Sequence, residues 1–268
     1  MAFFIFALSD EYNGYHPMCL ILFSYNNHPD YQLVLLANRD EFYNRSTQRA
    51  GWWSDQPDLL GGKDLKENGS WLAITKSGKF AAITNYRDPK QMKPGAPTRG
   101  RLVTNFLLDH YTPEEYLKEL KKSGAHYNGF NLIFGRQNEI FYYSNSVNTH
   151  QRLHPGNYGL SNALLETPWP KVVKGKRKLD ALLNGTGTFS MERAVKDLKD
   201  PEWANDQELP DTGIGIEKER LLSSMFIETP GYGTRCTTIM TIDRQNIVTF
   251  REVSYMPEGE FSTSFQIQ

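Results

Sequence analysis

The chain of 268 residues has little cysteine, with only Cys19 and Cys236. Two thiols cannot form a disulfide framework, and the six scattered histidines do not match the spacing of a metal site, so we expect no metal. No apolar run is long enough to cross a bilayer, and the apolar start from Met1 to Leu8 lacks the preceding Lys or Arg of a secretory signal. We therefore expect no membrane span and a cytoplasmic location.

An excess of charge of either sign is also absent, because 30 Lys and Arg face 31 Asp and Glu. Phosphate binding needs clustered basic residues, so no nucleic-acid partner is expected. The densest basic cluster, from Lys171 to Lys178, is interpreted as the solvated face of a helix. With 39% hydrophobic and 13% aromatic content and no linker-like stretch, residues 18–268 are expected to form a single domain.

Strand patterns arrive in groups that are separated by helical patterns. The expected strands are 19–24, 31–37, 71–75, 79–84, 130–134, 140–144, 158–161, 237–242 and 247–253. The expected helices are 101–109, a helix capped by Thr112 and stopped at Gly124, 170–183, 191–199 and 217–226. Without regular strand–helix alternation, this order predicts an α+β fold of antiparallel sheets covered by helices. A four-layer α/β/β/α sandwich is one such arrangement.

Met18 and Cys19 stand at the head of the first apolar run. If the chain began at Cys19, its α-amine and its thiol would supply a general base and a nucleophile in one residue, the arrangement of an N-terminal-nucleophile (Ntn) hydrolase. The alternative is that Cys19 is a small buried hydrophobe, as lone cysteines usually are. In the full chain the nitrogen of Cys19 is an amide, so we interpret residues 1–17 as an extension that is disordered, processed or a non-native start.

A second polar segment, Asn38-Arg39-Asp40-Glu41, is expected where the second strand ends. A hairpin returns that end to the start of the first strand, so Arg39 or Asp40 is expected near Cys19. An arginine lowers the pKa of a thiol, and a carboxylate orients an α-amine. The alternative is a surface turn with an internal salt bridge.

These segments, together with later ones, resemble the family named for its Asn-Arg-Asp-Glu motif, the transport and Golgi organization protein 2 homologues. The further matching segments are 62–65, 68–71, 84–87, 98–100, 159–163, 169–171 and 233–238. The family resembles the cysteine Ntn hydrolases that cleave conjugated bile salts and penicillin V, and this implies the four-layer sandwich of two antiparallel sheets.

The same resemblance implies a set of site residues. The implied catalytic residues are Cys19, Arg39, Asp40, Asn85, Asn162 and Arg235, and the implied substrate-binding residues are Asn38, Glu41, Trp71, Tyr86 and Arg99. Asn85 or Asn162 would donate to the oxyanion or bind substrate. Because Arg39 and Asp40 are adjacent, extended backbone points their side chains in opposite directions, and Asn38 or Glu41 is the alternative to one of them.

Two functions follow from this reasoning. The first is an amidohydrolase in which Cys19 attacks a linear C–N amide through a thioester, with no cofactor required. The second, which the resemblance implies, is a non-catalytic carrier of haem, a lipid or acyl-CoA on the same fold. The expected partner is therefore a small-molecule amide or a hydrophobic ligand, and the sequence defines no oligomeric state.

Overall fold

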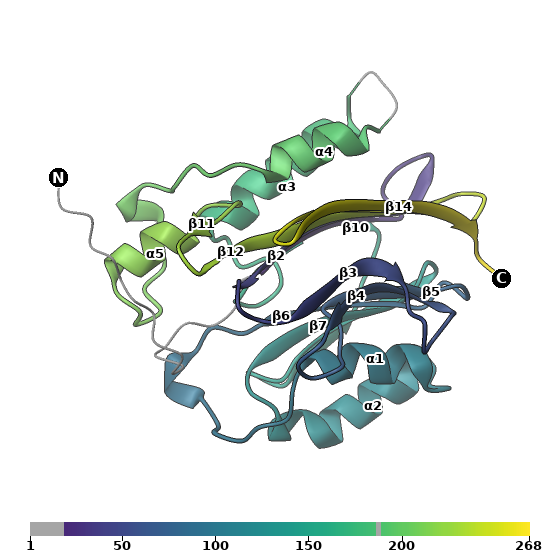
Figure 1. Cartoon of the computed structure of the whole chain (residues 1–268), viewed down its shortest axis with the longest axis horizontal. Coiled ribbons are helices and arrows are strands. Elements are labelled where there is room, and N and C mark those ends of the chain that lie inside the picture. Colours follow the sequence, from purple (N-terminus) through teal and green to yellow (C-terminus); the bar gives the residue numbers. More distant parts are fainter. Residues whose placement is uncertain (1–18, 186–188) are drawn as a thin grey trace.

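The computed structural model describes residues 19–185 and 189–268 and contains two β-sheets (Figure 1). The strands of the first sheet run in the order β10 (Gly156–Leu160), β1 (Cys19–Tyr25), β2 (Tyr31–Phe42), β12 (Tyr232–Asp243), β13 (Ile247–Tyr255) and β14 (Glu258–Gln266). All its neighbouring strands are antiparallel, and the short strand β11 (Glu228–Thr229) pairs with β12. The expected extension over residues 1–17, and Met18, lie outside the described residues.

The second sheet is also antiparallel and follows chain order. Its strands are β3 (Thr47–Trp52), β4 (Leu59–Asp64), β5 (Leu72–Thr75), β6 (Phe80–Asn85), β7 (Phe130–Arg136), β8 (Glu139–Ser144) and β9 (Thr149–Arg152). The helices are α1 (Gly100–Leu108), α2 (Pro113–Ser123), α3 (Pro170–Leu183), α4 (Met191–Leu198) and α5 (Ile216–Leu222), with 3-10 turns at Pro89–Gln91, Gly124–His126 and Asp206–Glu208.

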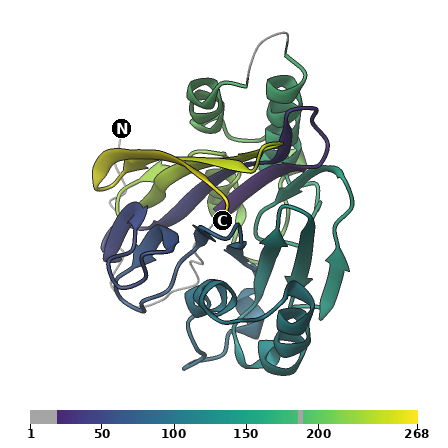
Figure 2. The same cartoon turned by 90° about the vertical axis from the view of Figure 1, so that its right-hand side faces the viewer.

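The two sheets are packed face to face, and helices cover both outer faces. Helices α3 and α4 pack on the first sheet, and α1 and α2 pack on the second. Figure 1 shows the four layers from top to bottom, and Figure 2 shows the same order from the side, with green helices above one sheet and teal helices below the other. The predicted α/β/β/α sandwich is confirmed.

Side chains of β2 point alternately to the two faces of the first sheet, so this strand contributes to two hydrophobic cores. Leu33 and Leu35 lie in the core between the sheets, whereas Val34 and Leu36 lie in the core under α3 and α4. All four side chains are at most 1% exposed. This register also decides which polar residues at the far end of β2 face the second sheet and which face the helices.

The prediction for β2 was wrong in length, because the strand does not end at Ala37 but continues to Phe42. The segment from Asn38 to Glu41 is therefore inside a strand. Pairing with β12 along the whole stretch, and with β1 as far as Arg39, satisfies backbone groups of these polar residues. A hydrophobicity pattern does not reveal such pairing. The same pairing extends β12 back to Tyr232.

Five strands, four of them with six residues or fewer, were not predicted from the sequence. They are β3, β4, β9, β11 and β14. Strand β14 packs the half-buried Phe261 and Phe265 against the core between the sheets, but Gly259 and Thr263 share that face, and β4 contains two glycines. The predicted N-terminal cap of α2 is confirmed, because the Thr112 side chain accepts from the Glu115 N–H in a capping box.

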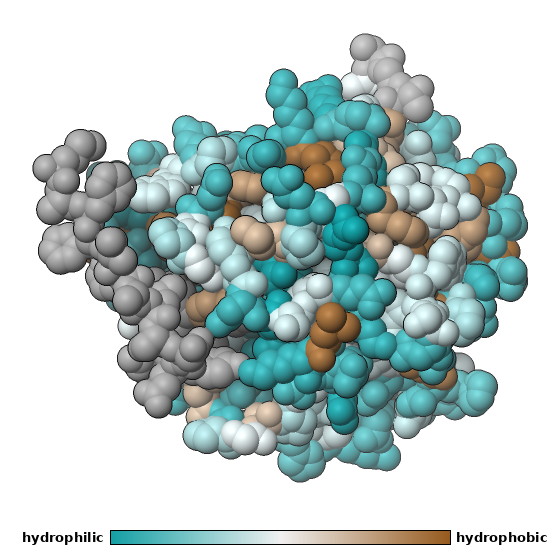
Figure 3. Space-filling view, viewed as in Figure 1, coloured by the Kyte–Doolittle hydropathy of each residue, from teal (hydrophilic) through white to brown (hydrophobic). Residues whose placement is uncertain are grey.

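On the face shown in Figure 3, the described hydrophobic residues form separate spots on a largely hydrophilic surface. Among residues 19–185 and 189–268, no helix combines the length and the apolar composition that crossing a membrane requires. Within the same residues, no three His, Cys, Asp or Glu side chains group as a metal site.

Candidate active site

Cys19 is the first residue of β1, opposite Arg39 of β2. Side chains from other elements hold both backbone groups of Cys19. Its N–H donates to Asn162 Oδ1 at 3.3 Å, and its carbonyl accepts a hydrogen bond from Ser161 Oγ at 2.9 Å. The nitrogen of residue 19 thus has a side-chain acceptor.

Asn162 follows the end of β10, and it connects Cys19 to the end of β6. Its Nδ2 donates to the Asn85 carbonyl at 2.8 Å, while its own carbonyl accepts from the Arg87 N–H at 2.7 Å. Asn162 is completely buried. The structure therefore brings Cys19, Asn85 and Asn162 together through hydrogen bonds across the two sheets.

A chain of buried hydrogen bonds that the sequence analysis missed supports this junction from the second sheet. Tyr142 donates to Asn131 Oδ1 at 2.8 Å, and Asn131 Nδ2 donates to Thr84 Oγ1 at 3.1 Å. Thr84 Oγ1 then donates to the Ser161 carbonyl at 2.7 Å. The sequence features that could have indicated these hydrogen bonds were Thr84 and Asn131, which are polar residues within otherwise apolar strands, because buried polar groups require partners.

Arg39 and Asp40 lie on opposite faces of β2. Arg39 faces the second sheet, where its guanidinium lies 4.1 Å from the centre of the Trp71 ring and donates to Thr47 Oγ1 at 3.3 Å. Asp40 faces the helices, and its Oδ1 accepts from Thr234 Oγ1 at 2.6 Å. Its Oδ2 lies 4.0 Å from Lys171 Nζ.

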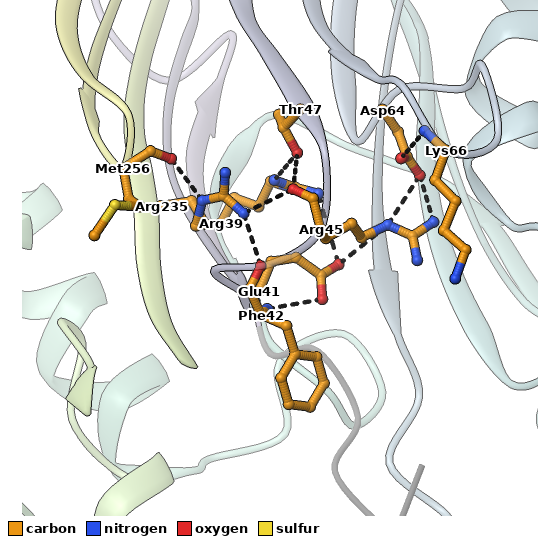
Figure 4. A network of polar contacts seen from close by, with 9 residues as sticks. All are labelled: Arg39, Glu41, Phe42, Arg45, Thr47, Asp64, Lys66, Arg235 and Met256. Atoms are coloured by element: carbon orange, nitrogen blue, oxygen red, sulfur yellow. Dashed lines mark hydrogen bonds and ion pairs between the residues drawn. The ribbon is translucent and has the colours of Figure 1, made fainter. Parts of the chain in front are cut away.

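On the inter-sheet face, Glu41 joins a network of charged side chains (Figure 4). Glu41 Oε2 lies 3.6 Å from Arg39 Nη2 and 3.8 Å from Arg45 Nε, and Arg45 Nη2 lies 2.5 Å from Asp64 Oδ2. Glu41 also accepts from the N–H of Phe42. The network fixes the turn that follows β2.

Arg235, an expected catalytic residue, contacts backbone at the same turn. Its Nε donates to the Met256 carbonyl at 2.6 Å, and its Nη1 donates to the carbonyls of Phe42 at 2.7 Å and Arg45 at 3.0 Å. These three hydrogen bonds tie β12 and β13 to the end of β2. The geometry of Arg235 is that of a residue that holds the turn in place.

The remaining expected residues lie in two places. Asn38 faces the helices, where Nδ2 donates to the carbonyls of Leu198 and Met225 and Oδ1 accepts from Thr237. The other two, Tyr86 and Arg99, both bind the Gly129 carbonyl, which accepts from Arg99 Nη1 at 3.0 Å and from the Tyr86 N–H at 2.9 Å.

The helix-side face also contains charged residues to which the sequence analysis gave no role. Lys171 is 1% exposed, so its assignment to a solvated face was wrong, although Lys174 and Lys176 do form ion pairs at the surface. Arg87 Nη1 lies 2.5 Å from Glu219 Oε2, and both side chains are at most 3% exposed. The sequence feature that could have indicated the burial of Lys171 was its position in the first turn of a helix, directly after Trp169 and Pro170.

The electrostatics of the site depend mainly on burial. Burial, followed by the Asp40 charge, raises the pKa of the Cys19 thiol to about 12, although a hydrogen bond from the Asp40 backbone and the Arg39 charge act in the opposite direction. Burial also raises the pKa of Asp40 to about 6 and lowers the pKa of Lys171 to about 8. In the full chain the thiol is therefore protonated at neutral pH.

Comparison with known proteins gives a match to the family model described as Transport and Golgi organisation 2, over residues 18–257. The chain belongs to this family. The human Transport and Golgi organization protein 2 homolog is 39% identical to it over 259 residues, covering 89% of this chain and 94% of the relative. Transport and Golgi organization protein 2 of Drosophila melanogaster is 29% identical over 277 residues, covering 91% and 96%.

This member of the Transport and Golgi organisation 2 family is also similar to two solved structures. One is a Caenorhabditis elegans N-acylethanolamine-hydrolyzing acid amidase ortholog, with a TM-score of 0.41, 12% identity and coverage of 83% of this chain and 92% of that one. The other is the C2A mutant of the conjugated bile acid hydrolase from Clostridium perfringens, with a TM-score of 0.39, 11% identity and coverage of 94% and 97%.

Proposed function

We propose that the residues around Cys19 form an amidohydrolase site that cleaves a linear C–N amide bond. The observation that carries this proposal is the hydrogen bond from the Cys19 nitrogen to Asn162 Oδ1. Asn162 is itself fixed by Asn85, so a buried side-chain oxygen is held in place to bind that nitrogen. An α-amine at residue 19 would find the same acceptor.

The chemistry needs a proton acceptor beside the thiol. With the ordinary pKa of an α-amine, roughly 7.7–8.0, the free nitrogen of Cys19 takes the thiol proton while the sulfur bonds to the amide carbon. The C–N bond then breaks, the leaving amine takes that proton, and water hydrolyses the thioester. In this proposal the Asn85 side chain donates to the developing oxyanion.

The test compares the full chain with a chain that begins at Cys19. We expect only the chain that begins at Cys19 to release amine from a panel of N-acyl amides and to give an acylated Cys19 by mass spectrometry. Cys19→Ala should abolish both signals, whereas the matched variant Cys236→Ala should keep them, because Cys236 is a buried core thiol. Amine release that survives Cys19→Ala would refute the proposal.

A second candidate function is a carrier of haem or another hydrophobic ligand. It is favoured by the amide nitrogen at residue 19 and by the raised pKa of the thiol, since both make Cys19 a poor nucleophile in the full chain. Mixing the full chain with hemin would shift the Soret band, and Cys19→Ala would reduce that shift if the thiol is a ligand. An unshifted band would exclude haem as the carried molecule.

A further inference from the structure

Three polar side chains of the second sheet point into the space between the sheets. Thr84 of β6 is paired directly with Asn131 of β7, and Tyr142 lies on the next strand, β8. Ala82 and Ile133 belong to the core between the sheets, and strand alternation gives the residues two positions away the same face. The three polar side chains are 1%, 0% and 3% exposed, so their partners must lie within the protein.

These side chains hold residues 161–165, the segment that follows β10. Each one bonds to the backbone of a different residue of that segment. Thr84 Oγ1 donates to the Ser161 carbonyl at 2.7 Å, Asn131 Nδ2 donates to the Ala163 carbonyl at 2.9 Å, and the Tyr142 hydroxyl accepts from the Leu165 N–H at 3.1 Å. We call Thr84, Asn131 and Tyr142 the clamp.

Hydrogen bonds within the clamp set the direction of the Thr84 hydroxyl. Tyr142 donates to Asn131 Oδ1 at 2.8 Å, which leaves the Asn131 amide group pointing its Nδ2 at Thr84 Oγ1, 3.1 Å away. Because Thr84 Oγ1 accepts from Asn131, its single hydrogen is directed to the Ser161 carbonyl. The three residues therefore work as one unit.

The segment that the clamp holds carries the acceptor for the Cys19 nitrogen. Asn162 lies between Ser161 and Ala163, the two residues whose carbonyls the clamp binds. Asn162 Oδ1 accepts from the Cys19 N–H at 3.3 Å, and the Ser161 hydroxyl donates to the Cys19 carbonyl at 2.9 Å. The clamp thus reaches Cys19 through residues 161 and 162.

We propose that Thr84, oriented by Asn131 and Tyr142, is a positioning residue that fixes Asn162 as the acceptor for the nitrogen of residue 19. The proposal rests on the proposed amidohydrolase function, in which that nitrogen is the base. Replacing Thr84 by Val keeps the branched shape and removes the hydroxyl. The Ser161 carbonyl then loses its donor, and Asn162 beside it is no longer held in one place.

The effect on the chemistry comes from the charge that the amine acquires. When the free nitrogen takes the thiol proton, it becomes an ammonium. A hydrogen bond from an ammonium to Asn162 Oδ1 is roughly twice as strong as one from a neutral amine. A fixed Asn162 therefore favours the proton transfer and raises the pKa of the amine. No proton passes through Thr84.

The first measurement is hydrogen exchange in the full chain labelled with nitrogen-15 at cysteine only. The chain has two cysteines, so its amide spectrum contains the signals of Cys19 and Cys236 alone. The Cys19 N–H reports its bond to Asn162, whereas Cys236, paired on both sides within β12, reports opening of the sheet. Thr84→Val should speed exchange at Cys19 about tenfold and leave Cys236 unchanged.

Two variants separate positioning from a general loss of stability. Thr84→Ser keeps the hydroxyl and should restore slow exchange at Cys19. Thr75→Val makes the same substitution at a buried threonine of β5, whose hydroxyl bonds to the Lys79 backbone in the hairpin, and it should leave Cys19 unchanged. Unchanged exchange in Thr84→Val, or equal acceleration of both cysteine signals, would overturn the proposal.

A second variant is available if Thr84→Val does not fold. Tyr142→Phe removes the hydroxyl that orients Asn131 and binds the Leu165 N–H. It should also speed exchange at Cys19 alone, and exchange that matches that of the unsubstituted protein would refute the clamp.

The second measurement uses the chain that begins at Cys19. Thr84→Val should lower kcat for amide cleavage about tenfold with little change in KM, because the clamp acts on the proton transfer. The midpoint of the rise of kcat with pH should move down by about half a pH unit, since the ammonium loses its fixed acceptor. Thr84→Ser should restore both values. A lower kcat with an unmoved midpoint would show a purely structural role and would overturn the proposal.

The two measurements distinguish failure of the clamp from failure of the amidohydrolase. Exchange at Cys19 that depends on Thr84, without amide cleavage by either chain, would support the clamp and refute the amidohydrolase. Amide cleavage by the chain that begins at Cys19, with exchange that does not depend on Thr84, would support the amidohydrolase and refute the clamp.

Discussion

The two faces of β2 hold charge in different ways. On the inter-sheet face, Glu41 and Arg45 belong to a connected set of ion pairs and hydrogen bonds in which each charge has a close partner. On the helix-side face, Asp40 and Lys171 are more deeply buried but lie 4.0 Å apart. The first arrangement holds a turn in place, whereas the second keeps two groups near a protonation change.

The largest expected effect tests the helix-side face. Lys171→Met should lower the free energy of unfolding by about 3–5 kcal/mol, because it leaves the Asp40 carboxylate buried without a counter-charge. Adding Asp40→Asn should recover much of that loss. Urea unfolding at pH 7 measures both.

The matched control is Lys174→Met on the same helix. Lys174 is 33% exposed and pairs with Asp200 and Glu202, so its loss should cost about 1 kcal/mol or less. Equal losses for Lys171→Met and Lys174→Met would show that burial of the Asp40–Lys171 pair has no special weight.

A smaller effect is expected on the inter-sheet face. Arg235→Met removes the donor from three backbone carbonyls and should lower the free energy of unfolding by about 2–3 kcal/mol. Arg235→Lys should recover only part of this, because one ammonium cannot reproduce the planar fork of donors. Full recovery of the unfolding free energy by Arg235→Lys would show that a single charge is sufficient at this position.

Much of the fold could be predicted from the sequence, and the reason lies in its apolar strands. The run from Leu33 to Leu36 is buried on both faces of the first sheet. The expected strands 71–75 and 79–84 leave a short connection, and Gly78 in that connection has a φ of 78°, which glycine adopts without strain. Sequence could not predict that β2 continues through Asp40, because the partner there is β12, which is distant in the chain.

Less of the candidate site than of the fold could be predicted from the sequence. The motifs named Cys19, Asn85 and Asn162, and the structure brings these three together. They did not reveal Lys171, because a lysine at the start of a basic helix has the pattern of a surface residue. Its burial depends on Asp40, which is 131 positions away in the chain.

The smallest expected effect is the pH dependence of the two faces. The raised pKa of Asp40, about 6, means that its contribution to stability is full at low pH and is lost as pH rises through 6. The lowered pKa of Lys171, about 8, means that its contribution is full at high pH and is lost as pH falls through 8. The pair therefore contributes least to stability between about pH 6 and 8.

Asp40→Asn/Lys171→Met removes both titrations, so the difference in unfolding free energy between the unsubstituted protein and this variant isolates the pair. From pH 7 to pH 4.5 that difference should move in favour of the unsubstituted protein by about 1–2 kcal/mol. Other carboxylates, such as Asp200 with a lowered pKa of about 2, titrate in both proteins and cancel. A difference that stays constant with pH would mean that Asp40 and Lys171 titrate as they do in the unfolded chain, and the contrast between the two faces of β2 would then be one of packing alone.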